Sequence, residues 1–443
     1  MVYPARNIFK GSLIFILFFS VVSLAHASSS DLNNNGIDDS EEADVVMEAS
    51  TTLPAGEYNF NNLTITNNAV LTLEGDPDSS ESFKGVKITA ANLTLDSGAR
   101  VSADLKGYFS ESGPGAPSSG TVGASHGGNG YTDPEDRTYG SATLPIDLGS
   151  GGPTRGGGAI RIVAENFINN GVVSSGGGPS SAGGSIYVTT HNLSGDGSFE
   201  ANGGGMHISS LLRGPGGGGR VAIYYNNSSF AGIAEAKGGC GRFDGFSFTC
   251  ANDGTVGLFD TLNNNLLVDS SWRFQANDSP FNLNNILLTG NSKTTAEDGA
   301  VLNAADLVLD QNSSLTLLNQ TLNIPTITVD EGSVLTLTES ESYFVDTLTI
   351  TGNSTVTVAP EKILYLDLQN LIINSGSYLE ANGKGYLDGP GTPDDVSLNG
   401  ASYGGKGGGP DAKPVYGSAT APLDFGSGIN RRGGGAIRLI VEN

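Results

Sequence analysis

The sequence predicts an all-β chain, a right-handed parallel β-helix (β-solenoid) with long Gly-rich loop insertions. Three observations predict this class: strand-like units that return every 20 to 23 residues, glycine motifs that each precede an alternating strand, and a module that occurs twice. Alternation at period 2 is typical of strands with one buried face, and a short repeat without helical periodicity is typical of solenoids. The glycines, 65 of 443 residues, cluster between β-branched runs, which argues against disorder.

Residues 1–27 have the pattern of a secretory signal peptide. Arg6 and Lys10 precede an apolar run from Leu13 to Val22, and the small-residue site Ala25-His26-Ala27 follows. An uncleaved membrane anchor is the alternative, but the run is shorter than the roughly 18 apolar residues that a spanning helix needs. We therefore expect an exported bacterial protein, extracellular or at the cell surface, whose mature chain has no transmembrane span.

Residues 28–50 combine a linker with a loop in the register of an EF-hand. Oxygen-bearing side chains occupy loop positions 1, 3, 5, 9 and 12, a glycine occupies position 6, and a backbone carbonyl is available at position 7. The predicted Ca²⁺ ligands are Asp31, Asn33, Asn35, Ile37, Asp39 and Glu42. A solvated, Asx-rich linker is the alternative. The loop resembles thrombospondin type 3 and dockerin repeats, which implies calcium binding without a full EF-hand.

Residues 51–260 are predicted as a β-helix module with Gly-rich loops. Its motif, Gly-Gly-x-[Ile/Val]-x-[Ile/Val/Leu]-x-x-x-Asn, begins at Gly157, Gly183 and Gly218, and once more at Gly434. A glycine pair before a strand permits positive φ and close approach of backbones, so we expect tight corners between stacked coils. A phosphate-binding loop is the alternative, but neither the P-loop pattern nor the dinucleotide-binding pattern occurs.

Cys240 and Cys250 are the two cysteines of the chain, and they predict a local disulfide. An exported protein meets an oxidising compartment, where a pair at this spacing is expected to join. Two free thiols are the alternative. The loop that the bridge would close, from Gly241 to Thr249, is short, so its entropic contribution to stability is expected to be modest.

Residues 261–378 are predicted as regular β-solenoid coils. Units such as Leu307-Val-Leu and Ile327-Thr-Val are each followed by a polar turn and a second alternating stretch, and serines mark the repeat at positions 292, 313, 333, 354 and 377. Each strand should pair in parallel with its equivalent one coil away. The residues expected to point inward are Leu307, Leu309, Ile327, Val329, Leu348, Ile350, Leu371 and Ile373.

Residues 379–443 repeat the start of the Gly-rich part of the first module. Tyr139-Gly-Ser-Ala-Thr reappears 277 residues later as Tyr416-Gly-Ser-Ala-Thr, and Gly156-Gly-Gly-Ala-Ile-Arg reappears as Gly433-Gly-Gly-Ala-Ile-Arg. Each copy contains a long loop rich in Gly, Pro and Ser: the first loop spans residues 107–156 and the second loop spans residues 385–433. The second copy is cut short at Asn443, where the first continues, so we expect a longer polypeptide.

The sequence gives catalysis little support. His126, His191 and His207 are expected at turns or on the surface, since none has metal-ligand spacing to another His or Cys. Parallel β-helix lyases and hydrolases often pair Asp with Arg or Lys, and the candidate set of this kind is Asp147 with Arg155 and Arg161, mirrored by Asp424 with Arg432 and Arg438. A structural clasp of the long loop explains the same recurrence and is the favoured interpretation.

The repeated Gly-Gly-x-Ile-x-Ile and Glu/Ser-Ala-Asn-Gly patterns make residues 51–443 resemble the Gly-rich, repeat-containing, adhesin-like β-helix proteins of bacterial surfaces. The resemblance implies extracellular display or adhesion, with extracellular glycans or cell-surface molecules as partners; a polysaccharide lyase or glycoside hydrolase is the alternative. Without residues 1–27 the chain has 20 basic and 46 acidic residues, a net charge of −26, which argues against nucleic acid. Tyr108, Tyr131 and Tyr139 form the candidate ligand surface, because tyrosine combines flat apolar contact with a hydroxyl.

Overall fold

The computed structural model describes residues 30–33, 36–117, 121–133, 135–206, 213–242 and 248–442. The predicted all-β class is confirmed, with 40% strand and 2% helix. The helical segments in the described residues are two short 3-10 turns, η1 (Asp39–Glu41) and η2 (Ala276–Asp278). No helix within these ranges is long and apolar enough to cross a membrane. The predicted signal peptide lies outside the described residues.

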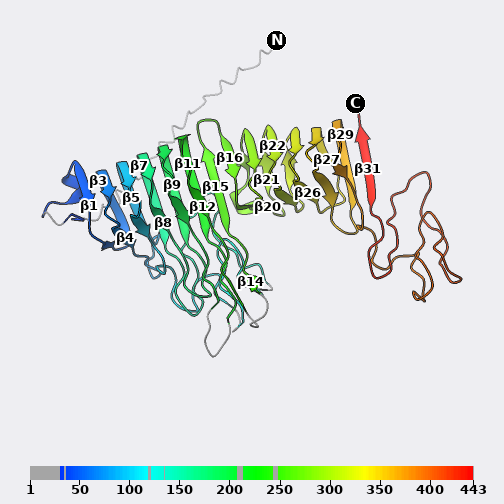
Figure 1. The fold of residues 1–443 in the computed structure, drawn as a ribbon, viewed down its shortest axis with the longest axis horizontal. Coiled ribbons are helices and arrows are strands. Elements are labelled where there is room, and N and C mark those ends of the chain that lie inside the picture. Colours follow the sequence, from blue (N-terminus) through cyan, green and yellow to red (C-terminus); the bar gives the residue numbers. More distant parts are fainter. Residues whose placement is uncertain are drawn as a thin grey trace, which may run out of the picture.

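The strands stand side by side along the long axis of the molecule, in chain order from β1 to β31 (Figure 1). Fourteen of them form one continuous sheet. In spatial order these strands are β1 (Asp44–Met47), β3 (Gly56–Ile65), β5 (Val86–Leu95), β7 (Ala159–Asn169), β9 (Ser185–Ser194), β11 (Arg220–Ser228), β15 (Thr255–Asp260), β16 (Asn265–Val268), β19 (Asn285–Leu288), β22 (Asp306–Leu309), β25 (Thr326–Val329), β27 (Tyr343–Ile350), β29 (Ile363–Ile373) and β31 (Ala436–Val441).

Smaller sheets complete the architecture. One consists of β2 (Thr51–Leu53), β4 (Val70–Leu73), β6 (Arg100–Ser102), β8 (Val172–Ser174), β10 (Ser198–Glu200) and β12 (Ile233–Glu235). A second consists of β17 (Ser271–Phe274), β20 (Lys293–Ala296), β23 (Ser314–Leu317), β26 (Val334–Leu337), β28 (Thr355–Val358) and β30 (Tyr378–Leu379). A third consists of β18 (Phe281–Asn282), β21 (Val301–Asn303) and β24 (Thr321–Asn323), and a hairpin joins β13 (Cys240–Arg242) to β14 (Phe248–Cys250).

Strands one repeat apart pair in parallel, as the repeat predicts. Leu307 pairs with Ile286 of the preceding repeat and Ile327 of the next. Six of the eight residues expected to point inward are at most 2% exposed, which confirms them: Leu307, Leu309, Ile327, Val329, Leu348 and Ile350. Leu371 and Ile373 lie in register with the buried Leu348 and Ile350 and therefore face the same side, but Leu371 is half-buried and Ile373 is 43% exposed. The reason is that β31 covers β29 from Ile363 to Leu368 and leaves the rest of β29 open.

Strand direction reverses once along the large sheet. The N-terminal stack (β1 to β15) and the C-terminal stack (β16 to β31) are each parallel within this sheet, but β15 and β16 pair antiparallel, with Phe259 opposite Leu266. In the described residues the hairpin β13–β14 is the only other antiparallel pair. The reversal takes place over residues 261–264.

The cores of the two stacks lie on opposite faces of the shared sheet. Val256 of β15 belongs to the core of the N-terminal stack, whereas Phe259 and Leu266 belong to the core of the C-terminal stack. Residues an odd number of positions apart on a strand face opposite sides of a sheet, which separates Val256 from Phe259. Strand direction and core side therefore reverse together, and this combination is equivalent to a half-turn about the stacking axis.

The glycine motif marks places where backbones touch. A Cβ added at Gly157, Gly183 or Gly218 would lie within 2.2 Å of a backbone carbonyl oxygen. None of these three glycines, nor Gly434, has a positive φ. The expected close approach is therefore confirmed at these three glycines, and none of them uses the positive φ that glycine permits. At Gly434 nothing lies within 4 Å of the Cβ position.

Polar residues of successive repeats form ladders. The asparagine that ends the glycine motif lies in a row along one exposed corner, with side-chain hydrogen bonds of 2.6–3.1 Å linking Asn62, Asn92, Asn166, Asn192 and Asn227. The repeat serines of the C-terminal stack are buried instead, and the backbone N–H of each donates to the next hydroxyl, at 3.1–3.3 Å along Ser313, Ser333, Ser354 and Ser377. In-register stacking thus explains the repeat spacing.

Gly183→Ala should lower the free energy of unfolding by about 1–3 kcal/mol or more, because its methyl group would overlap a carbonyl oxygen and force the backbone apart. Gly434→Ala, at the equivalent motif position with open space, should change stability by less than about 0.5 kcal/mol. Urea titrations of the two variants and the parent measure the difference. Equal losses at both positions would contradict the close-approach explanation.

Candidate functional site

The first loop, residues 107–156, spans both strand stacks. The Asp136 carboxylate pairs with the Arg273 guanidinium of β17, at 2.5 Å between Oδ2 and Nη2. The backbone N–H of Ala142 donates to Asp278 Oδ2 at 2.8 Å, and Ala142 itself is fully buried in the core of the C-terminal stack. A loop that begins and ends in the N-terminal stack is therefore fastened to the C-terminal stack.

Under this loop lies a buried polar cluster of His126, Arg220 and Tyr139. His126 and Arg220 have no exposed surface. His126 Nδ1 lies 2.8 Å from the carbonyl oxygen of Gly183, and its ring centroid lies 4.7 Å from that of Tyr139. Arg220 Nε donates to the Tyr139 carbonyl oxygen at 3.0 Å, and Nη1 donates to Thr255 Oγ1 at 3.3 Å. The cluster ties the loop to strands β11 and β15.

His126 lies in a bend of the first loop, in agreement with the expected turn position, but it is fully buried and not at the surface. His191 is exposed, as expected, and His207 lies outside the described residues. Burial, followed by the charge of Arg220, lowers the pKa of His126 to about 3, so the ring is neutral at pH 7. Burial lowers the pKa of Arg220 to about 10, and the guanidinium stays charged. A neutral imidazole without solvent contact cannot exchange protons with an outside substrate.

One sequence signal could have located this cluster. Arg220 follows the glycine pair of its motif, where the other copies of the motif have Ala159, Ser185 and Ala436. A charged side chain at a position otherwise occupied by small residues indicates a buried partner nearby. The partners, however, come from the first loop, which has no repeat pattern from which a contact could be predicted.

The candidate catalytic residues Asp147, Arg155 and Arg161 each contact different groups. Arg155 Nη2 donates to the Gly107 carbonyl oxygen at 3.1 Å, and the Arg161 guanidinium carbon lies 5.3 Å from the centroid of the Tyr187 ring. Burial raises the pKa of Asp147. Among the described residues, no hydrogen bond or ion pair joins the Asp147 carboxylate to either arginine.

One of the two arginines of the second copy makes an equivalent contact. Arg432 Nη1 donates to the Gly385 carbonyl oxygen at 3.0 Å, as Arg155 does to Gly107, and this contact closes the base of each loop. The Arg438 guanidinium carbon lies 4.4 Å from the centroid of the Tyr365 ring. Tyr365 belongs to the preceding strand β29, however, whereas Tyr187, the partner of Arg161, belongs to the following strand β9.

The three candidate tyrosines have different environments. The Tyr139 hydroxyl donates to the Leu148 carbonyl oxygen at 2.6 Å, and in the second loop the Tyr416 hydroxyl bonds to Phe425 in the same way. Tyr139 therefore supports the loop through its hydroxyl group. All three tyrosines, Tyr108, Tyr131 and Tyr139, are half-buried.

The predicted calcium loop has the turn that such a loop requires. Gly36 at position 6 has φ +86°, and its N–H donates to Asp31 Oδ2 at 2.9 Å. Asn33 Nδ2 donates to Glu42 Oε2 at 3.0 Å, which brings positions 3 and 12 together. The predicted ligand Asn35 lies outside the described residues, and Ile37 lies in the loop with 48% exposure.

Asp39, at position 9 of this loop, is a fully buried carboxylate. Its oxygens accept from the Leu32 N–H at 3.0 and 3.1 Å. Burial raises the pKa of Asp39, and the negative charges of Glu42 and Asp31 raise it further, so two predicted ligands lie close enough to act on a third. Across the described residues, no three His, Cys, Asp or Glu side chains are already close enough to hold a metal ion.

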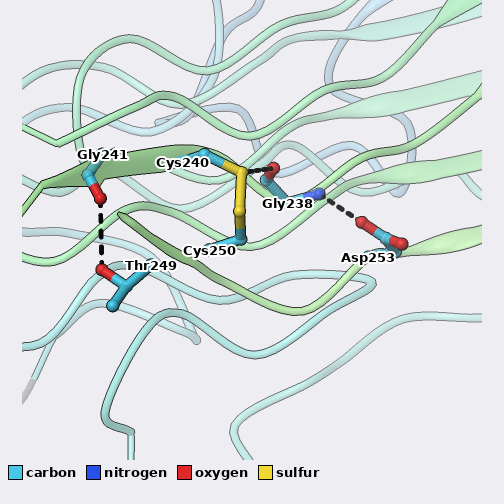
Figure 2. The surroundings of a disulfide bond; sticks show 6 residues. All are labelled: Gly238, Cys240, Gly241, Thr249, Cys250 and Asp253. Atoms are coloured by element: carbon cyan, nitrogen blue, oxygen red, sulfur yellow. Dashed lines mark hydrogen bonds between the residues drawn. A yellow bond between two sulfur atoms is a disulfide. The ribbon is translucent and has the colours of Figure 1, made fainter. Parts of the chain in front are cut away.

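The predicted disulfide between Cys240 and Cys250 is confirmed (Figure 2). The two cysteines lie directly opposite each other in the antiparallel pair β13–β14. Next to the bridge, the Gly238 N–H donates to Asp253 Oδ1 at 2.8 Å. The hairpin is thereby fixed to the segment that leads into β15.

No family model, curated protein or solved structure matches the chain. A functional assignment therefore depends on the loop contacts, buried groups and charges of this molecule.

Acid should destabilise the fold through His126. Its pKa is about 3 in the folded chain, below the ordinary value of 6.5, so the unfolded chain binds the extra proton between these values. The contribution of His126 to the free energy of unfolding is therefore fully present above pH 6.5. It decreases as the pH falls, by up to about 1.4 kcal/mol per pH unit. His126→Gln should reduce the slope between pH 6.5 and 4.5 in urea titrations, and His191→Gln, at an exposed site, should not. Identical slopes for the parent and His126→Gln would contradict the prediction.

Proposed function

We propose that the chain is an exported, cell-surface, adhesin-like scaffold that presents two copies of one loop to extracellular glycans. The observation that carries the proposal is that both loops are constructed alike, with the same arginine contact at the base and the same tyrosine contact inside. The second loop projects from the end of the strand stack, and the first from its side (Figure 1). Repeated presentation of one loop favours multivalent contact.

We interpret both stacks as right-handed parallel β-helices. Support comes from the parallel pairing of strands one repeat apart. Connections between parallel strands of one sheet are right-handed in about 98% of cases. Because the half-turn at β15–β16 preserves the hand, the same assignment holds for both stacks. Such a solenoid supplies length and lateral surface.

Two features support export. The Cys240–Cys250 bridge is of the kind that persists in oxidising compartments. The acidic excess, a net charge of −24 over the whole sequence, keeps a protein soluble and attracts divalent cations.

Adhesion accounts for the loop better than catalysis does. An enzyme of the lyase or hydrolase type needs acids and bases that reach the substrate. His126 is enclosed, and Arg155 and Arg161 are occupied with backbone and ring contacts rather than with Asp147. The catalytic alternative is retained as one outcome of the binding experiment.

Calcium is the proposed cation, at Asp31, Asn33, Asn35, Ile37, Asp39 and Glu42. The turn at Gly36 and the influence of two carboxylates on a third support it. A divalent cation would offset the repulsion among Asp31, Asp39 and Glu42. Because asparagine occupies two ligand positions, an affinity near the extracellular range of about 10⁻⁴–10⁻³ M is expected.

Calcium titrated into the mature protein should give a binding heat in a calorimeter, and Glu42→Ala should abolish it, because Glu42 supplies the last carboxylate ligand. Glu41→Ala is the matched control, since it removes a neighbouring exposed acid outside the ligand set. Absence of heat in the parent, or equal heat in Glu42→Ala, would remove the site.

The mature protein, incubated with calcium on a panel of neutral and acidic polysaccharides, should be retained without releasing reducing or unsaturated ends. Tyr131→Ala should weaken retention severalfold, because a ring can contribute about 1 kcal/mol of contact. Tyr378→Ala, an exposed tyrosine on β30, is the control. Turnover that is abolished by Asp147→Ala would replace the adhesin proposal with a lyase or hydrolase.

A further inference from the structure

A groove of about 720 Å³ lies where the two strand stacks meet. Three segments line it: the disulfide hairpin with residues 251–254, the strands β17 and β20, and the first loop at Asn129 and Asp136. Its volume is in the range of sites that bind small ligands, roughly 300–1,000 Å³. The first loop and the Arg273–Asp136 ion pair fix the distance between its walls.

The groove has a larger share of basic residues than the acidic chain as a whole. Its lining includes three cations, Lys237, Arg273 and Lys293, and two carboxylates, Asp136 and Asp253, whereas acidic residues outnumber basic ones 46 to 22 in the chain. Because Glu235 and Glu297 also pair with two of these cations, the groove favours an anionic group only where a cation is left unpaired.

The three cations are not equally available. Arg273 is held by Asp136 and by Glu297, at 2.6 Å between Nε and Oε1, and Lys237 pairs with Glu235. Lys293 is exposed on β20, and within the described residues no carboxylate lies at ion-pair distance from it. Its ammonium is free to bind an anion that enters the groove.

The other polar groups of the groove can form hydrogen bonds with the hydroxyl groups of a ligand. Asp253 uses Oδ1 to accept from the Gly238 N–H, at the hairpin shown in Figure 2, and its Oδ2 has no hydrogen-bond donor in the described part of the chain. Asn252, beside it, is exposed and lines the groove. A free acceptor and an amide that line the same groove as a free cation match a ligand that carries hydroxyl and carboxylate groups together.

A peptide fits these walls less well. Trp272, the one aromatic residue of the lining, is 1% exposed and packs in the core against Phe259 and Phe274, so the groove offers no apolar pocket for side chains. We propose that this groove binds an acidic oligosaccharide, with Lys293 on its carboxylate and Asp253 and Asn252 on its hydroxyls. The proposal rests on the glycan-contacting role proposed above and identifies the class of glycan and its site.

The test is calorimetric titration of the mature protein with a tetrasaccharide of a 1,4-linked hexuronic acid. The same tetrasaccharide with its carboxylates reduced to hydroxymethyl groups should bind at least tenfold more weakly. Lys293→Gln should weaken binding of the uronate about tenfold, the usual effect of one charge-assisted hydrogen bond. Lys406→Gln is the matched control, because Lys406 is exposed, has no ion pair in the described residues and lies in the second loop, outside the groove.

If Lys293→Gln and Lys406→Gln weaken binding of the uronate tetrasaccharide equally, binding depends on the overall charge of the protein and the proposal is overturned. Equal affinity for the reduced tetrasaccharide would overturn the acidic class, and tighter binding of a hexaglutamate peptide would overturn the saccharide class. Polysaccharide retention by the parent, unchanged in Lys293→Gln and Asp253→Asn, would remove the groove but leave the surface role. Loss of retention by every polysaccharide of the panel would remove that role itself.

Discussion

The constraint on which the structure depends is the parallel backbone ladder, which holds neighbouring strands about 4.8 Å apart in fixed register. Because the strands are in register, each residue lies beside its equivalent in the next repeat. Identical side chains at equivalent positions must therefore pack or hydrogen-bond with one another without a clash. Asparagine meets this condition because its amide can donate to one neighbour and accept from another, as Asn166 does between Asn92 and Asn192. Glycine meets it where the loops bring backbones into contact, as at Gly183.

The reversal at β15–β16 adds a junction to this ladder. Because the two cores lie on opposite faces of one sheet, the outer face of the N-terminal stack becomes the wall of the C-terminal core. Tyr224 and Phe259 stack there, with ring centroids 4.3 Å apart, and Trp272 continues the aromatic row. Gly257 lies in this layer because a Cβ would approach the Trp272 ring to 2.6 Å. Aromatic packing on this face thus adds to the β15–β16 backbone pairing and to the first loop in joining the two stacks.

The sequence was sufficient for the strands and for their parallel pairing within each stack, but not for the reversal between the stacks. Alternation identifies which residues of a unit share a face, so Leu307 and Ile327 could be placed inside from their pattern. The pattern does not show where one pair of neighbouring strands turns antiparallel, because the turn at residues 261–264 is polar like the other turns. The exposure of Ile373 depends on how far β31 extends along β29, which alternation does not encode. Register could be inferred from repeats, whereas contacts made by single-copy loop residues could not.

In the candidate site too, features with a local sequence pattern could be predicted, and contacts between distant segments could not. The disulfide could be inferred from two cysteines at a local spacing, whereas calcium binding by the loop at residues 31–42 stays a prediction. The groove combines residues from a loop, a hairpin and two strands that belong to opposite sides of the reversal, and no local pattern connects Asp253 with Lys293. Their presence in one groove follows from the antiparallel step and from the first loop that spans it. Within each stack, equivalent positions of successive repeats carry similar side chains. Different side chains meet at the β15–β16 junction, where the repeat is interrupted, and a groove that binds a specific ligand needs such a combination of different groups.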